Sequence, residues 1–115
     1  MTLGDKQRLF TQKVCLLIQW AYDNGYELTF GDAFRDPRLH GKFGEQGGYG
    51  RGSSCHKIRL AVDFNLFKDG EYLTSTEDHK PLGEFWESLH PLCRWGGRFS
   101  SPDGNHYSFE HDGFR

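Results

Sequence analysis

Apolar residues recur at spacings of three and four between Asp5 and about Asn24, where the stripe consists of Phe10, Val14, Leu17, Ile18 and Ala21. This spacing is typical of an amphipathic helix that buries one face. Gly25 follows Asn24, and glycine readily takes the left-handed conformation that ends many helices. Residues 26–30 then alternate and are rich in strand formers, so a short strand is expected after the helix.

A second alternating pattern, from Leu60 to Phe67, predicts a strand with two unlike faces. Its apolar face is formed by alternate residues, Leu60, Val62, Phe64 and Leu66. Asp63 lies on the opposite, more polar face. Turn residues at 68–71, followed by Tyr72-Leu73, predict a hairpin to a return strand.

The C-terminal half predicts one further helix and a final strand. Pro81 suits the first turn of a helix. The core-facing stripe of that helix ends before Pro91 and contains Leu82, Phe85, Trp86 and Leu89. A turn at 103–105 leads into a strand that His106 begins and that continues to Glu110. These elements predict an α+β fold, a small antiparallel sheet with helices packed on one side.

Length and composition narrow the class of protein. A chain of 115 residues is expected to form one domain, residues 1–115, with a single modest core. A formal net charge of -2 argues against nucleic acid as a partner. We expect neither a signal peptide nor a membrane span, because the N-terminus lacks an apolar region and the aliphatic runs are short. The three cysteines are expected to be free thiols of a protein made in a reducing cytoplasm.

Six glycines lie between Gly41 and Gly52, in a stretch without apolar periodicity. The pattern indicates a mobile loop rather than part of a packed element. Two interpretations are open: a loop that closes over a substrate, and a surface insertion that binds nothing.

The candidate chemistry lies in His56, Asp63 and His106. Two imidazoles and one carboxylate suit zinc, and three protein ligands leave a fourth tetrahedral position for water, as in hydrolytic sites. Asp103 stands three residues before His106 and could act as a base. His56 precedes Asp63 by an odd number of residues, so it must lie in a loop before the strand or beyond a bulge if both bind one ion. A zinc site that includes Cys55 is disfavoured, because adjacent side chains diverge in an extended chain.

Taken alone, the pair His56 and Asp63 is weak evidence for a metal site, because a loop histidine is commonly solvated and a strand aspartate can be an edge charge. The ordered pattern Ser54-x-His56-x6-Asp63, with Ala61-Val62 before the aspartate and Asp103-x2-His106 later, resembles zinc peptidases that share the fold of D-Ala-D-Ala carboxypeptidases and dipeptidases. Phage members of that family are endolysins, some of them L-alanyl-D-glutamate peptidases. The resemblance implies a hedgehog/DD-peptidase-like fold, zinc ligands His56, Asp63 and His106, and Asp103 as the base.

Two further features belong to this resemblance. The family places an arginine after an early strand, where it binds a substrate carboxylate or stabilises the polarised carbonyl, and Arg35 matches it. Residues 95–97, Trp-Gly-Gly, resemble the sequence that precedes the second motif in phage endolysins. The chain departs from the family at Arg59, where glycine is common, and in the spacer at 100–102. Arg59 could alter the loop geometry or bring a charge near the cleft.

The resemblance therefore implies a zinc-dependent peptidase with one zinc per chain, which hydrolyses peptide bonds of bacterial peptidoglycan as a phage or prophage endolysin. The bond would be of the L-alanyl-D-glutamate or D-Ala-D-Ala type. The alternatives are a D,D-carboxypeptidase or dipeptidase of wall metabolism and a non-catalytic domain that binds zinc or the cell wall. We expect a monomer whose partner is the peptidoglycan stem peptide, with no membrane partner. It would be made in the cytoplasm and act on the wall after release through a membrane hole made by another protein.

Overall fold

The long N-terminal helix, α1 (Leu3–Asp23), begins slightly earlier than the apolar stripe predicts. The computed structural model describes residues 1–44 and 54–115. Thr2 caps the helix: its Oγ accepts from the Asp5 backbone N–H at 3.1 Å, and the Asp5 carboxylate accepts from the Thr2 backbone N–H at 2.9 Å. Gly25 follows the helix with φ 83°, the left-handed conformation expected there.

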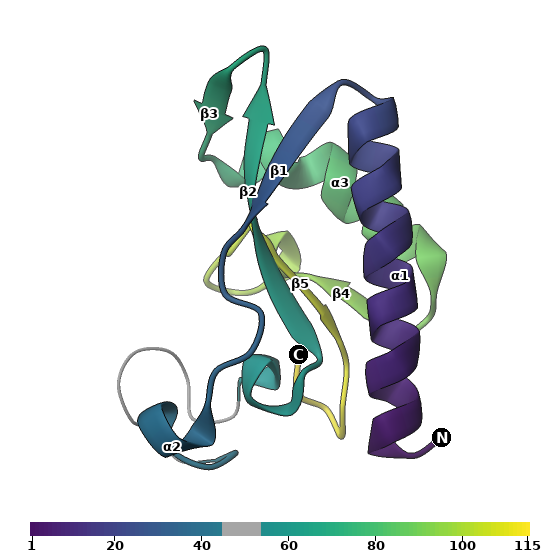
Figure 1. Cartoon of the computed structure of the whole chain (residues 1–115), viewed down its shortest axis with the longest axis vertical. Helices are drawn as coiled ribbons and strands as arrows, with labels where there is room; N and C mark the ends of the chain where they lie inside the picture. Colours follow the sequence, from purple (N-terminus) through teal and green to yellow (C-terminus); the bar gives the residue numbers. More distant parts are fainter. Residues whose placement is uncertain (45–53) are drawn as a thin grey trace.

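Within the described residues the sheet has five antiparallel strands, β1 (Tyr26–Phe30), β2 (Ala61–Lys68), β3 (Glu71–Leu73), β4 (Cys93–Trp95) and β5 (His106–Phe109). Their order is β1-β2-β5-β4, with β3 also paired to β2 (Figure 1). The first part of β2 pairs with β5, and its second part pairs with β1 and β3. Strand β2 is therefore the centre of the sheet, as its apolar face suggests.

Both long helices, α1 and α3 (Thr76–Leu89), lie against the same face of the sheet. The ring centroid of Phe109 in β5 lies 5.3 Å from that of Phe10 in α1. Tyr107, on the same face of β5, lies 6.3 Å from Trp86 in α3. Because side chains alternate along a strand, His106 projects from the opposite face. The predicted α+β fold is confirmed, and the helix-free face carries the candidate site.

The predicted start of the second helix, at Pro81, is wrong. Helix α3 begins at Thr76, because Ser75 and Asp78 form a capping box in which each side chain accepts from the other residue's backbone N–H. Pro81 lies inside the helix on its exposed side. The predicted stripe holds, since Leu82 and Trp86 are fully buried.

The remaining described elements are short: helix α2 (Pro37–His40) and two 3-10 helices, η1 (Cys55–Ile58) and η2 (Gly96–Arg98). Most of the glycine-rich segment predicted to be a loop, residues 45–52, lies outside the described residues. The cysteines, all within the described part, are thiols as predicted. Among the described residues, no helix has the length and apolar character needed to cross a membrane.

Candidate metal centre

Three predicted ligands, far apart in the sequence, meet on the helix-free face of the sheet. Pairing of β2 with β5 places Asp63 directly opposite His106. His56 reaches them from η1, the loop element before β2, as the odd spacing requires. The candidate ligand atoms of His56, Asp63 and His106 all lie within 4.8 Å of one another. Cys55 does not belong to this group.

The orientation of His56 is set by two neighbours. The Ser54 hydroxyl caps η1 by accepting from the His56 backbone N–H at 3.2 Å. The imidazole Nδ1 lies 3.1 Å from the carbonyl oxygen of Ala33. Since a carbonyl can only accept, Nδ1 carries the proton and Nε2 presents a lone pair to the site. This is the tautomer that a metal ligand needs.

The ligand atoms point to a common centre rather than bonding in pairs. Oδ1 of Asp63 lies 3.2 Å from Nε2 of His56 and 3.4 Å from Nδ1 of His106. Yet this oxygen and His56 Nε2 are both buried and have no hydrogen-bond partner among the described residues. Burial raises the pKa of Asp63, but the imidazoles of His106 and His56 outweigh it and bring the pKa to about 2. An ionised carboxylate with two imidazoles fits a divalent zinc ion.

The Trp-Gly-Gly sequence holds the loop that leads to His106. The Trp95 indole Nε1–H donates to the Gly104 carbonyl at 2.7 Å, and the Asp103 backbone N–H donates to the Gly96 carbonyl at 2.9 Å. A side chain at Gly97 would overlap the Trp95 ring, and one at Gly96 would overlap the Asp103 carbonyl. Glycine is therefore required at both positions for this close packing.

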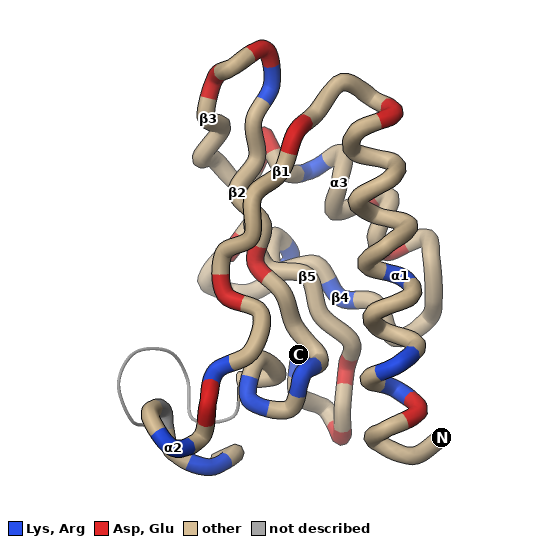
Figure 2. The backbone as a smooth tube through the Cα atoms, in the orientation of Figure 1, with Lys and Arg blue, Asp and Glu red and all other residues tan. Residues whose placement is uncertain are grey.

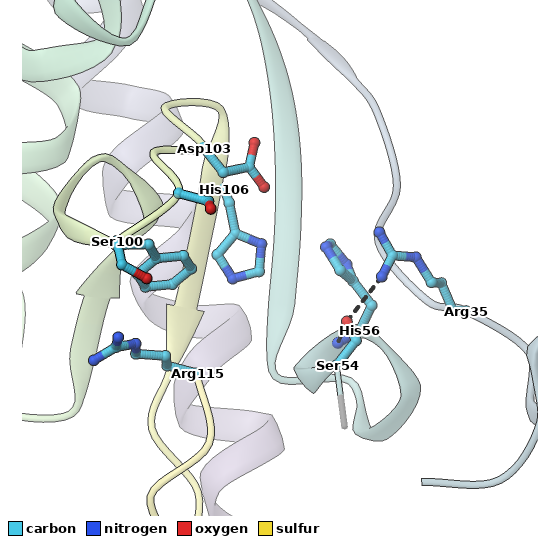
Figure 3. Close-up of a pocket in the computed structure, with 9 residues that line it drawn as sticks. Arg35, Ser54, His56, Ser100, Asp103, His106 and Arg115 are labelled. Carbon is cyan, nitrogen blue, oxygen red and sulfur yellow. Dashed lines mark hydrogen bonds between the residues drawn. The ribbon is translucent and has the colours of Figure 1, made fainter. Parts of the chain in front are cut away.

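The ligands open into a pocket of about 280 Å³, shown in Figure 3. Its lining residues are Arg35, Ser54, His56, Phe99, Ser100, Ser101, Asp103, His106 and Arg115. Asp103 is exposed and lies beside His106 in the close-up, on the side opposite Arg35. The predicted base and the predicted arginine thus border one pocket with the ligands His56 and His106. The roles of all five predicted site residues stay predictions.

Arg35 is held at the pocket by side chains that flank it. Its Nη1–H donates to Ser54 Oγ at 2.9 Å, and its Nε lies 3.3 Å from the Asp32 carboxylate. Its backbone N–H donates to the His56 carbonyl at 3.1 Å. Ser54 thus links the arginine to η1. This double contact explains why a serine stands two residues before His56. Sequence reasoning missed Asp32 and Ala33, since nothing in their residue types reveals such contacts.

The opposite wall of the pocket combines an aromatic ring and a second cation. Phe99 packs against His106, with ring centroids 5.3 Å apart. The Arg115 guanidinium lies 4.8 Å from the centroid of Phe99. Lys and Arg positions are frequent at the end of the molecule that carries α2 and the C-terminus (Figure 2). This end of the site is suited to a substrate with a carboxylate.

Neither Arg59 nor His79 lines the metal pocket. Arg59 takes the left-handed conformation, φ 58°, at the end of η1, and its guanidinium lies 4.0 Å from the centroid of the Phe34 ring. His79 is buried, only 2% exposed, and its Nδ1 lies 2.8 Å from the Tyr107 hydroxyl.

A family model described as D-alanyl-D-alanine carboxypeptidase matches residues 47–109, more than half of the chain. The chain belongs to this peptidase family. The match contains His56, Asp63, Asp103 and His106, whereas Arg35 lies before it. Comparison with curated proteins gives no match.

Proposed function

We propose that the protein is a zinc-dependent peptidase that hydrolyses peptide bonds of bacterial peptidoglycan, as an endolysin of a phage or prophage. The observation that carries the proposal is the convergence of ligand atoms from His56, Asp63 and His106, of which His56 Nε2 and Asp63 Oδ1 are buried without a hydrogen-bond partner among the described residues. Membership of a D-alanyl-D-alanine carboxypeptidase family supports a peptidase acting on this polymer. The protein would act as a monomer on the cell wall, after release from the cytoplasm.

His56, Asp63 and His106 would hold one zinc ion per chain. When bound, zinc supplies Lewis acidity to the scissile carbonyl and to the attacking water. Asp103, exposed at the pocket and beside His106, would take the proton of the water as general base and return it to the leaving amine. Burial of both imidazoles excludes bulk water from the ligands themselves.

Arg35 would bind the charged part of the substrate. A guanidinium offers paired donors in a fixed plane, which match a carboxylate or the developing oxyanion. Its side chain is 12% exposed and already oriented by Asp32 and Ser54, so little conformational freedom would be lost on binding. We propose that the scissile bond is of the L-alanyl-D-glutamate or D-Ala-D-Ala type, where a carboxylate lies next to the bond.

The substitution Asp103→Asn tests the proposal. The amide is nearly isosteric and the substitution changes none of the three ligands, so the zinc content and melting temperature should stay near those of the wild type. Release of peptide fragments from purified peptidoglycan, followed by mass spectrometry, should fall by about two to four orders of magnitude. Undiminished release would remove Asp103 from the mechanism. A wild-type protein that binds zinc and releases no fragments would instead be a binding domain.

A further inference from the structure

A second cavity, of about 210 Å³, adjoins the metal pocket at Asp103. It lies beside the middle of β2, where pairing with β5 has ended and pairing with β3 has not yet begun. The pairing with β5 ends at Asp63, and the pairing with β3 begins at Leu66. Its lining residues are Phe64, Asn65, Tyr72, Leu73, Thr74, Thr76, His79, Pro102, Asp103, Gly104 and Asn105. A substrate that passes over Asp103 would reach both cavities.

The two cavities differ in charge. The metal pocket contains the guanidinium groups of Arg35 and Arg115. None of the residues that line the second cavity is a lysine or arginine, and its one acid, Asp103, is the shared residue at the border. His79 is neutral near pH 7, because burial lowers its pKa to about 4. Carboxylates of the substrate are therefore favoured in the metal pocket, and uncharged groups in the second cavity.

The polar groups of the second cavity are hydroxyls and amides next to a half-exposed aromatic ring. Tyr72 OH lies 3.4 Å from Asn65 Oδ1, and Asn65 Nδ2 donates to Thr29 Oγ1 at 3.2 Å. The Tyr72 ring stacks on Phe67 with centroids 5.1 Å apart, yet Tyr72 remains 54% exposed. An aromatic face beside neutral hydrogen-bonding groups matches a sugar ring, which has an apolar C–H face and hydroxyl and amide edges.

We propose that the second cavity is a substrate subsite for an uncharged group rich in hydroxyls and amides, the amino sugar that carries the stem peptide. The inference rests on the proposed function and extends it. The substrate would lie across Asp103 with its sugar against Tyr72 and its carboxylate toward Arg35. The enzyme would then favour a bond close to the glycan strand over one at the free end of the stem peptide.

Two soluble fragments test the subsite: a muropeptide, and the same stem peptide with an acetyl group in place of the sugar. For the wild type, kcat/KM should be about tenfold or more higher for the muropeptide, equal to about 1.4 kcal/mol. Tyr72→Ala should bring this ratio to within about twofold of one while leaving hydrolysis of the acetylated peptide nearly unchanged. Tyr72→Phe, which keeps the ring, should retain part of the preference.

Tyr22 provides the matched control, because it is also about half exposed, at 48%, and lies on α1. Tyr22→Ala should leave the ratio at the wild-type value. Equal kcat/KM for both fragments in the wild type, or a ratio that Tyr72→Ala does not change, would overturn the subsite alone. Hydrolysis of neither fragment, with no release from intact peptidoglycan, would overturn the proposed function and the subsite with it.

Discussion

Arg59 departs from the family pattern that the sequence resembles, but its side chain does not line the metal pocket. Its φ of 58° and ψ of 36° lie in the left-handed region, which favours glycine over residues with a side chain. The guanidinium stacks over Phe34, away from the metal pocket. The conformational cost of a left-handed arginine is therefore offset in part by a cation–π contact.

A pair of substitutions separates these two effects. Arg59→Gly and Arg59→Ala both remove the guanidinium, but only glycine relieves the left-handed backbone. We expect Arg59→Gly to be more stable than Arg59→Ala by about 1 kcal/mol in urea denaturation. Equal midpoints for the two variants would show that the backbone at this position is not strained.

His79 makes stability depend on pH. The folded protein holds it neutral, with its pKa lowered by burial from 6.5 to about 4. Below about pH 6.5 the unfolded chain binds a proton at His79 that the folded chain does not bind. The free energy of unfolding therefore falls as the pH decreases toward 4. Between about pH 7 and pH 5 the wild type should lose about 2 kcal/mol more than His79→Gln. Parallel losses in the two proteins, measured by urea denaturation with a chelator present, would contradict this account.

At the scale of single residues, the sequence predicts the candidate metal ligands better than the groups that hold those ligands in place. Asp63 is visible because it lies on the polar face of a predicted strand, and because its spacing from His56 matches an ordered motif. The partner of His56 Nδ1 is the main-chain carbonyl of Ala33, which no residue type reveals. The burial of His79 could not be predicted for a related reason, because its partner Tyr107 lies far along the chain.

At the scale of elements, a buried tryptophan links α3 to the loop that carries the candidate base. The Trp95 ring lies against Gly83 of α3 and against Gly97, and its indole N–H donates a hydrogen bond to the Gly104 carbonyl. The long helices and strands β1, β2 and β5 were predictable from periodicity over many residues. Strand β4 has only three residues, too few for any pattern, and α3 starts early because a capping box lies before Pro81.

Two glycine substitutions in helices test this link. A Cβ at Gly83 would overlap the Trp95 ring, so Gly83→Ala should destabilise the protein by about 1–3 kcal/mol and weaken zinc binding. In α1, a Cβ at Gly4 would meet only the flexible end of Arg8, at 3.3 Å, and Thr2 Oγ at 3.9 Å. Gly4→Ala should leave stability unchanged or slightly higher. Equal melting temperatures for the two variants would contradict the packing described for Trp95.

At the scale of the whole molecule, one face of the sheet packs against the helices and the other face carries the candidate metal centre. Helices α1 and α3 cover the face with Tyr107 and Phe109, and the opposite face presents Asp63 and His106. The alternation along β2 and β5 made this division predictable. The two adjoining cavities were not predictable, because each is bounded by loops whose positions depend on packing between distant elements.

The proposed function depends most on the binding of a single zinc ion by His56, Asp63 and His106, and on the role of that ion in peptide hydrolysis. Titration of chelator-treated protein with zinc, followed by the release of new amino groups from purified peptidoglycan, tests it directly. Hydrolysis should be absent at the start, rise with added zinc and reach a plateau near one equivalent per chain, and His106→Ala should show no rise. Full hydrolysis by the metal-free protein, or an undiminished plateau in His106→Ala, would contradict the proposed function.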